Sequence, residues 1–232
     1  MSELLVNEVF ETIQGEGSYT GTPSIFVRLQ GCPVGCPWCD TKHTWDVLPE
    51  NETSAEIIML ESSETPRYFK STSEQLFSLF ARQGYTAKHI VVTGGEPCMF
   101  DLHDFSQKAI DSGFTMQIET SGTFNIQCAD KVWVTLSPKI NMKAGMPILM
   151  QAMLRANEIK HPIAMQKHID ELDELLHNTH NQAKLAAVEF KCPQVYLQPI
   201  SQQERATELA IKTCIKRNWR LSVQLHKYIG VE

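Results

Sequence analysis

Seven short runs rich in Val, Ile and Leu recur along the chain, and most of them end at Gly, Pro or Ser. Runs of this length and composition are typical of β-strands. They cover residues 24–30, 89–95, 115–122, 131–138, 157–163, 194–201 and 220–227. Helical patterns lie between most of them, and strands that alternate with helices imply a parallel sheet with right-handed crossovers. We therefore expect an α/β fold whose parallel sheet forms a barrel or a partly open barrel.

The helical patterns have recognisable ends. One helix is expected to begin with Ser73 as its cap and to end at Gly84, and another to end at Gly113. A third has Pro147 near its start, and a fourth covers residues 168–178. In the last long helix, spacings of three and four residues predict one buried face, made of Ala206, Leu209, Ala210, Thr213 and Cys214.

Residues 46–72 interrupt the alternation. The segment is polar and carries scattered acidic residues. We interpret it as an insertion with one short helix, which serves either as a cap or merely as a solvated excursion. The rest of the chain is expected to form a single domain over residues 1–232.

Composition limits the classes of function. With 232 residues and 42% hydrophobic content, the chain can form one substantial core. A formal charge of −6 disfavours binding to nucleic acid. No apolar run reaches the roughly 20 residues of a membrane helix, and the N-terminus lacks the pattern of a signal peptide, so we expect a cytoplasmic protein. An odd number of cysteines, seven, in a reducing compartment argues against a disulfide framework.

Three of the cysteines are crowded into "GCPVGCPWCDTKHTW", where Cys32, Cys36 and Cys39 have the spacing C-x3-C-x2-C. Thiolates are soft ligands that select zinc, copper(I) or iron–sulfur clusters. A structural zinc site needs four ligands, and His43 is the best local fourth one. An iron–sulfur cube held by three cysteines instead leaves one iron open. The remaining cysteines, at 98, 128, 192 and 214, are interpreted as small buried hydrophobic residues.

Other unusual motifs follow the predicted strands: "TGGEP", "ETSG", "SPK" and "QPIS". In parallel α/β folds the active site lies beyond the carboxyl ends of the strands. These motifs and the cysteine loop are therefore expected to meet at one face, although each alone has an ordinary explanation as a turn or a cap.

The cysteine spacing resembles that of the radical S-adenosylmethionine (SAM) enzymes, and "GGEP" resembles that family's contact with the methionine end of SAM. The resemblance implies an open parallel β/α barrel and a [4Fe–4S] cluster on Cys32, Cys36 and Cys39. SAM would bind the open iron and give a 5′-deoxyadenosyl radical on reduction, so no side chain is expected as an acid or base catalyst. By the same resemblance, the SAM contacts are Trp38, Cys39, Asp40, Gly94, Gly95, Glu96, Glu119, Ser121, Ser137, Pro138, Lys139, Gln198, Pro199, Ile200 and Ser201.

Nearly the whole chain, apart from the insertion, resembles one family of these enzymes, the 7-carboxy-7-deazaguanine synthases. The segments that carry the resemblance include "VNEVFETIQGEGSYTGTPSIFVRLQGC", "QIETSGT", "NEIKHP", "LQPISQ" and "RLSVQLHKYIG". The implied activity is that of a carbon–nitrogen lyase of queuosine and 7-deazapurine biosynthesis. It would contract the ring of 6-carboxy-5,6,7,8-tetrahydropterin to 7-carboxy-7-deazaguanine with loss of ammonia, and it would use Mg²⁺ and regenerate SAM.

The resemblance also implies the substrate contacts, which are Ile13, Gln14, Gly15, Glu16, Arg28, Thr93, His226 and the terminal carboxylate of Glu232. Thr41 matches the Mg²⁺ ligand, and a hydroxyl oxygen suits that hard ion. Four of these have structural alternatives. Arg28 could form an internal ion pair, Thr41 could be a turn hydroxyl, His226 could be a satisfied barrel histidine, and Glu232 could belong to a flexible end.

Two rival functions remain at this point. One is another radical SAM enzyme, such as a glycyl-radical activase, which Arg28, Thr41 and "IQGEG" oppose. The other is a zinc-stabilised binding module. The family resemblance further implies a flavodoxin or ferredoxin as electron donor and a homodimer, whereas no nucleic acid or membrane partner is expected.

Overall fold

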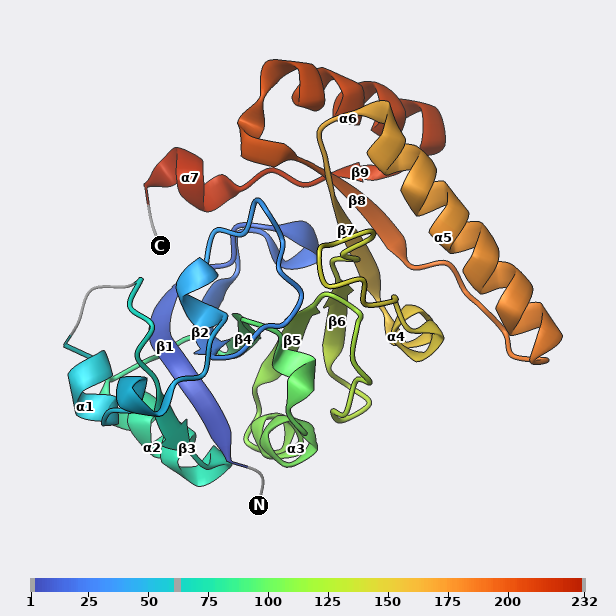
Figure 1. The fold of residues 1–232 in the computed structure, drawn as a ribbon. Coiled ribbons are helices and arrows are strands. Elements are labelled where there is room, and N and C mark those ends of the chain that lie inside the picture. The colour runs from blue at the N-terminus through green and yellow to red at the C-terminus, as the bar shows by residue number, and fades with distance from the viewer. Residues whose placement is uncertain (1–2, 61–63, 231–232) are drawn as a thin grey trace.

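Nine strands form one sheet, in the order β3-β1-β2-β4-β5-β6-β7-β8-β9, in the computed structural model, which describes residues 3–60 and 64–230 (Figure 1). Seven of these strands run parallel to one another, from β2 to β9. They are β2 (Pro23–Leu29), β4 (His89–Gly94), β5 (Thr115–Thr120), β6 (Trp133–Leu136), β7 (Glu158–Ile163), β8 (Gln194–Pro199) and β9 (Arg220–Leu221). All seven lie within one residue of the predicted runs or inside them.

One edge of the sheet is antiparallel, which the sequence did not predict. β1 (Leu4–Ile13) pairs antiparallel with both β2 and β3 (Phe69–Ser71). The pairing of β1 with β2 shifts register between Val6 and Glu8. Such an irregularity breaks the alternation of apolar and polar residues that identifies a strand in a sequence. It explains why β1 was not expected.

The predicted last strand, 220–227, is also too long. Only Arg220 and Leu221 pair in β9, and the chain then forms a short helix, α7 (Leu225–Ile229). The reason is visible at the start of α7, where the backbone N–H of Leu225 donates to the carbonyl of Gly15 at 3.0 Å. The C-terminal segment therefore leaves the sheet and packs against the turn between β1 and β2 (Figure 1).

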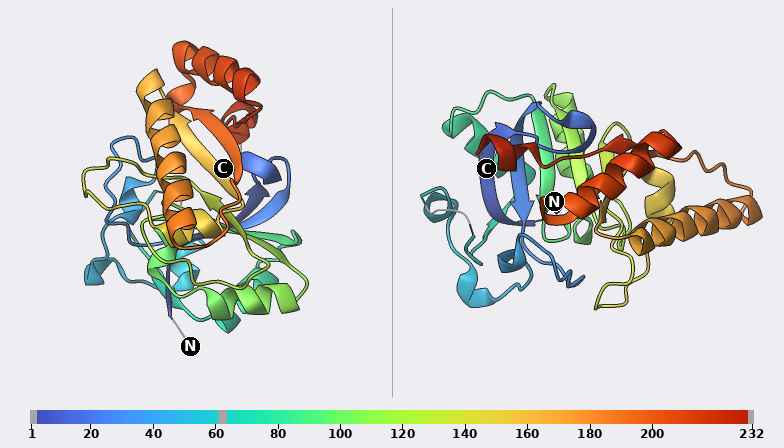
Figure 2. Two further views of the ribbon diagram at one scale, coloured as in Figure 1. Left: turned by 90° about the vertical axis from the view of Figure 1, so that its right-hand side faces the viewer. Right: turned by 90° about the horizontal axis from the view of Figure 1, so that it is seen from above.

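The helices cover the outer face of the sheet, with α5 packed on β7 and α6 on β8 (Figure 2). Their bounds are α1 (Ala55–Ile58), α2 (Ser73–Arg82), α3 (His103–Asp111), α4 (Met150–Arg155), α5 (Gln166–Leu185) and α6 (Glu204–Arg217). The cap of α2 is Thr72 rather than Ser73, since Thr72 forms a capping box with Gln75. The predicted buried face of α6 is confirmed for Ala206, Ala210, Thr213 and Cys214, and Leu209 is partly buried.

Residues 46–72 contain the single expected short helix, α1, but they are more than a solvated excursion. Ile58, Tyr68 and Phe69 are buried in or beside the main core. The segment also supplies all of β3, which extends the sheet beyond β1. The insertion is thus anchored to the barrel by apolar burial and strand pairing.

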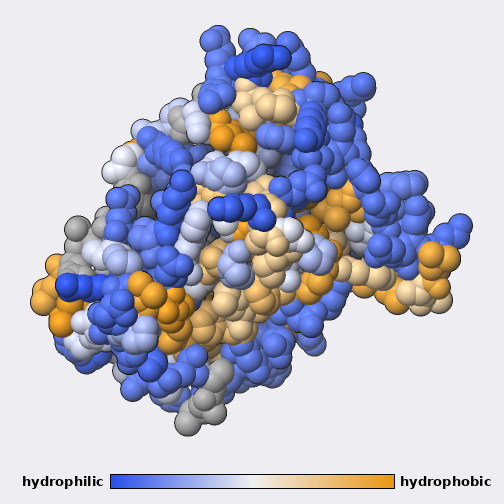
Figure 3. Space-filling view, viewed as in Figure 1, coloured by the Kyte–Doolittle hydropathy of each residue, from blue (hydrophilic) through white to orange (hydrophobic). Residues whose placement is uncertain are grey.

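Figure 3 shows hydrophilic residues over much of the outer surface and a band of paler and more apolar residues across the middle of the face seen. Exposed apolar side chains close to the cysteine loop include Trp38, Val47, Leu48 and Met99. Within residues 3–60 and 64–230, no helix has both the length and the apolar composition needed to cross a bilayer.

Candidate active site

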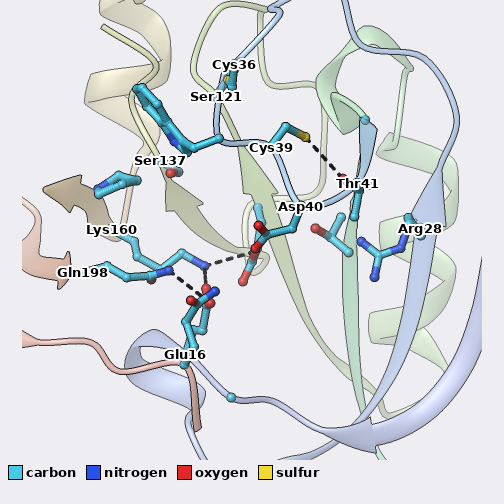
Figure 4. A pocket seen from close by; sticks show the side chains of 18 of the residues that line it. Glu16, Arg28, Cys36, Cys39, Asp40, Thr41, Ser121, Ser137, Lys160 and Gln198 are labelled. Atoms are coloured by element: carbon cyan, nitrogen blue, oxygen red, sulfur yellow. Dashed lines mark hydrogen bonds and ion pairs between the residues drawn. The ribbon is translucent and has the colours of Figure 1, made fainter. Parts of the chain in front are cut away.

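A cavity of about 360 Å³ opens where the parallel strands end (Figure 4). Its walls come from the turn after β1 and from the loops that follow β2, β4, β5, β6 and β8. A volume of this size is suited to a small-molecule ligand. The motifs that the sequence places after separate strands therefore do surround one space.

The three crowded cysteines all line this cavity. Backbone and side-chain contacts hold the last one in place, because Cys39 N–H donates to the Cys36 carbonyl at 3.2 Å and the Trp45 indole donates to Cys39 Sγ at 3.4 Å. Burial raises the pKa of the Cys32 thiol to about 11, and it raises the pKa of Cys36 as well. The thiols interact electrostatically with one another, so they form one group at the cavity wall.

The zinc alternative lacks its fourth ligand. His43 does not line the cavity. Burial lowers the pKa of its ring, which lies in the electrostatic field of Glu8 and Arg28. Among the described residues, no group of three or more His, Cys, Asp or Glu side chains converges as a single metal ion requires. A four-iron cube relaxes that requirement, because its three thiolates bind three different irons.

The glycine pair of "TGGEP" serves a packing purpose that we did not expect. A Cβ on Gly94 would lie 2.3 Å from the backbone nitrogen of Leu29, and one on Gly95 would lie 2.1 Å from the carbonyl oxygen of Gly31. Gly94 also has φ of +122°, which glycine adopts readily. The pair lets the end of β4 pack against the backbone that leads directly into Cys32, so these glycines position the cysteine loop.

Glu96 carries a carboxylate that is only 1% exposed. It accepts hydrogen bonds from the backbone of Cys98 at 2.9 Å, the hydroxyl of Thr120 at 2.6 Å and the backbone of Ser121 at 2.8 Å, and also from the Ser121 hydroxyl. Among the described residues, no cation forms an ion pair with it. A buried anion held by so many donors is preorganised to receive a positively charged ligand group.

Lys139 contributes a positive charge to the cavity, in contrast to the negative charge of Glu96. Its Nζ donates to Ser137 Oγ at 2.7 Å, and burial lowers the pKa of its ammonium group. Ser137 and Lys139 line the cavity, whereas Pro138 between them is buried and does not. Successive side chains of an extended segment point in opposite directions, which explains why the expected contact at Pro138 is not found.

The floor of the cavity is a cluster of charged side chains. Lys160, from β7, forms ion pairs with Glu16 and with Glu119, the latter at 3.1 Å (Figure 4). Gln198 donates to Glu16 Oε1 at 3.2 Å. Gln14 donates to Glu119 Oε1 at 3.2 Å and accepts from the backbone N–H of Glu16 at 3.1 Å, so its side chain links the Glu119 carboxylate to the backbone of the turn that carries Glu16.

Arg28 lies on another wall of the cavity. Its Nε donates to Glu8 Oε2 at 2.6 Å, and its guanidinium carbon lies 5.8 Å from the centre of the Phe10 ring, which stacks on Phe26. The structural alternative of an ion pair is therefore real. It is compatible with ligand binding, because a guanidinium that uses Nε has further donors on its two Nη atoms.

Gly15 and His226 meet where the C-terminal segment covers the turn after β1. A Cβ on Gly15 would lie 2.4 Å from His226 Nδ1 and 3.0 Å from its backbone nitrogen. Only glycine therefore lets α7 approach so closely. Burial lowers the pKa of the His226 ring, which is close to Glu16.

The chain was compared with known proteins. No protein-family model matches it. The 7-carboxy-7-deazaguanine synthase of Escherichia coli K12 is 51% identical over 226 residues, which cover 97% of this chain and 98% of that protein. The synthase of Buchnera aphidicola from Schizaphis graminum is 45% identical over the same shares of the two chains. The chain belongs to the 7-carboxy-7-deazaguanine synthase family.

A solved structure agrees with this membership. The crystal structure of QueE from Escherichia coli matches with a TM-score of 0.89 and 50% identity, over 97% of this chain and 95% of that one. The predicted fold, a partial (open) parallel β/α barrel of the radical SAM type, is confirmed, with a sheet that is mostly parallel. The predicted function as a 7-carboxy-7-deazaguanine synthase, a radical SAM enzyme of queuosine biosynthesis, is confirmed by the full-length relatives. The alternative of a glycyl-radical activase is wrong.

The cavity gathers most of the residues that the family resemblance singled out. Apart from Pro138 and Glu232, every predicted cluster, SAM, Mg²⁺ and substrate residue lines it. Glu232 lies outside the described residues. No described residue of 46–72 lines the cavity, so the idea that this insertion caps the site has no support there.

Several lining residues were not expected, and Lys160 is the most important. The others are Phe10, Phe26, Val34, Trp45, Thr120, Pro162, Gln224 and Lys227. A signal for Lys160 was available in "NEIKHPI", where Glu158 and Lys160 alternate with apolar residues inside a predicted strand. Charged residues at a spacing of two in a strand indicate that one of its faces is polar and enclosed.

The residues present fit the groups that the family uses. Three thiols line the wall next to Lys139, and the buried Glu96 carboxylate has no ion-pair partner among the described residues. Thr41 Oγ1 lies 3.6 Å from Cys39 Sγ, and the Thr44 hydroxyl donates to the Thr41 carbonyl at 2.8 Å and so fixes the turn. Sulfur atoms of the kind that bind iron and an oxygen atom of the kind that binds a hard cation therefore lie side by side.

Proposed function

We propose that the chain converts 6-carboxy-5,6,7,8-tetrahydropterin to 7-carboxy-7-deazaguanine, with loss of ammonia, using a [4Fe–4S] cluster, SAM and Mg²⁺. The observation that carries the proposal is that one cavity is lined by three cysteines at one wall and by Glu16, Arg28 and Lys160 elsewhere. The charged wall suits a pterin that bears a carboxylate. Each part is supported by a distinct set of contacts.

Cys32, Cys36 and Cys39 would hold the cluster, and SAM bound there supplies a hydrogen-abstracting radical when an electron arrives. Glu96 suits the ammonium group of SAM, since its buried carboxylate has several donors but no counter-cation among the described residues. Lys139 suits the SAM carboxylate. Glu119 can accept hydrogen bonds from ribose hydroxyls, because its oxygens are fixed by Lys160 and Gln14.

The pterin would lie between the charged floor and Arg28. A pterin ring presents neighbouring N–H donors, and the Glu16 carboxylate can accept two of them. Arg28 can bind the substrate carboxylate through its Nη atoms, while Glu8 and the Phe10 ring fix its orientation. Thr93 and His226 complete the lining on this side. Thr41 would place Mg²⁺ beside the substrate carboxylate, where a cation can steer charge during the rearrangement.

The proposal also covers the electron donor, the oligomeric state and the location of the protein. We expect a low-potential donor of the flavodoxin or ferredoxin type, a homodimer, and a cytoplasmic protein that forms one domain. The seven cysteines are all free, which suits a reducing compartment. Exposed Trp38, Val47 and Met99 offer apolar surface beside the cysteine loop, where an electron would have to arrive.

An anaerobic assay tests the proposal. Protein reconstituted with iron and sulfide is mixed with a reductant, SAM, Mg²⁺ and the carboxylated tetrahydropterin. We expect 7-carboxy-7-deazaguanine and ammonia to form in equal amounts while SAM is conserved over many turnovers. A colourless protein that takes up zinc and gives no product would contradict the proposal, and so would consumption of one SAM per turnover.

A further inference from the structure

Lys160 lies between the candidate SAM contacts and the candidate pterin contacts. Its side chain is 6% exposed, and it contacts carboxylates from two different elements. Glu16 comes from the turn after β1 and is 12% exposed, and Glu119 comes from β5 and is 19% exposed. One ammonium group therefore joins the turn that carries the candidate pterin contact to the strand that carries a candidate SAM contact.

Each carboxylate is also held from its other side by a neutral amide. Gln198 bonds the second oxygen of Glu16 at 3.2 Å, and Gln14 bonds the second oxygen of Glu119 at 3.2 Å. The amides fix orientation but add no charge. Lys160 is thus the cation that balances this pair of buried acids.

The charge balance explains why that cation matters. Two carboxylates in one buried cluster repel each other and lose hydration, and both effects favour protonation. Burial alone would raise the pKa of Glu16, yet Lys160 holds it below its ordinary value. Burial opposes the charge on Lys160 in turn, but Glu119 and Glu16 raise its pKa. The other charged groups facing the cluster are Lys139 and His226.

We propose that Lys160 is a positioning residue shared by two subsites, which holds the Glu16 carboxylate in place for the pterin and the Glu119 carboxylate in place for SAM. The proposal rests on the proposed function of the cavity. It differs from a contact role, because Lys160 acts through the two acids and touches neither ligand. Removal of Lys160 should therefore weaken the binding of both SAM and the pterin, whereas substitution of Glu16 or of Glu119 should each weaken the binding of only one of them.

Calorimetric titrations of the anaerobically reconstituted protein with SAM alone and with the carboxylated pterin in the presence of SAM test this. We expect Lys160→Met to weaken both affinities about tenfold or more. Glu16→Gln should weaken only the pterin, and Glu119→Gln only SAM. Lys160→Arg retains the charge and can contact both acids, so it should keep both affinities within about threefold of the unsubstituted protein. The exposed Lys184→Met is the matched control for losing a lysine.

A pH series separates positioning from general loss of structure. Without Lys160, the Glu16 carboxyl has a raised pKa, so pterin affinity in Lys160→Met should fall as the pH falls, relative to the unsubstituted protein. The double variant Glu16→Gln/Lys160→Met should lose this extra pH dependence. Circular dichroism reports whether each variant is folded. If Lys160→Met does not fold, the Arg, Glu16→Gln and Glu119→Gln variants still carry the test.

Three results would overturn the inference. The first is a folded Lys160→Met protein that binds both ligands like the unsubstituted protein. The second is a Lys160→Arg protein as defective as Lys160→Met, and the third is that Glu16→Gln and Glu119→Gln each weaken both ligands alike. Failure of the proposed function gives a different result, because the unsubstituted protein would then bind neither SAM nor the pterin.

Discussion

Cys39 Sγ and Thr41 Oγ1 lie 3.6 Å apart on the loop that follows β2 (Figure 4). The two atoms belong to different classes of metal ligand, a soft thiolate and a hard hydroxyl. The proposed cluster and the proposed Mg²⁺ would therefore be held by neighbouring side chains of one loop. Their contributions can be separated, because each ligand can be removed without the other.

Replacing Cys39 tests the cluster. We expect Cys39→Ala to lower the iron and sulfide content of the reconstituted protein about tenfold or more and to abolish turnover. The proposed cluster is held by only three thiolates, and this variant leaves two. The visible absorption of the anaerobic protein and metal analysis measure this. Cys192→Ala is the matched control, since Cys192 is exposed and does not line the cavity. A Cys39→Ala protein with full iron content and activity would refute the assigned ligands.

Replacing Thr41 tests the magnesium site. Thr41→Val keeps the shape of the side chain and removes its oxygen, so the Mg²⁺ concentration for half-maximal activity should rise about tenfold. Thr41→Ser restores the hydroxyl and should restore the Mg²⁺ dependence. Iron content is the internal control and should be the same in all three proteins. If Thr41→Val responds to Mg²⁺ as the unsubstituted protein does, Thr41 is a turn hydroxyl and no more.

Arg28 distinguishes an ion pair from a substrate contact. Lysine can still pair with Glu8, but it cannot present two parallel donors to a second carboxylate. We expect Arg28→Lys to raise the KM for the pterin about tenfold, with little change in thermal stability. Steady-state kinetics and thermal unfolding together measure the two effects. Arg82→Lys, at an exposed ion pair with Glu56, is the control. An unchanged KM would leave Arg28 with a structural role only.

Much of the fold could be predicted because the parallel strands are rich in Val, Ile and Leu and are bounded by turn residues. Elements that depend on contacts distant in sequence could not. β1 is obscured by its register shift, and the end of β9 is decided by the hydrogen bond from Leu225 to Gly15. A periodicity argument contains neither effect.

The site was predictable to the extent that its residues belong to motifs. Residues in contiguous motifs, such as Glu96, could be assigned from the order of letters. Lys160 lies in "NEIKHP", a segment that carries the family resemblance but to which no role was assigned, and its importance comes from two acids that are 144 and 41 positions away in the chain but contact its ammonium group. The glycine pair shows the converse. Its place was predictable, but its function in packing β4 against Leu29 and Gly31 required the three-dimensional structure.

His161 makes the stability of the fold depend on pH. It lies on the face of β7 opposite the cavity, where its Nε2–H donates to the His168 carbonyl at 2.8 Å. That bond leaves Nδ1 as a bare nitrogen, which is buried without a partner among the described residues. The pKa of His161 is therefore lowered from 6.5 to about 4, chiefly by burial and also by Lys139 and the His168 ring, while the hydrogen bond to the His168 carbonyl and the charge of Glu171 oppose the shift. Since the unfolded chain binds this proton more readily, the contribution of His161 is fully present above pH 6.5 and is lost as the pH falls toward 4.

Denaturant unfolding at several pH values measures this contribution. Between pH 6.5 and pH 4, the unsubstituted protein should lose about 2 to 3 kcal/mol more stability than His161→Gln, which has no proton to gain. His180→Gln, on the exposed side of α5, should leave the slope unchanged. Parallel curves for the unsubstituted protein and His161→Gln would mean that His161 is protonated in the folded state, and the tautomer inferred from its bond to His168 would then be wrong.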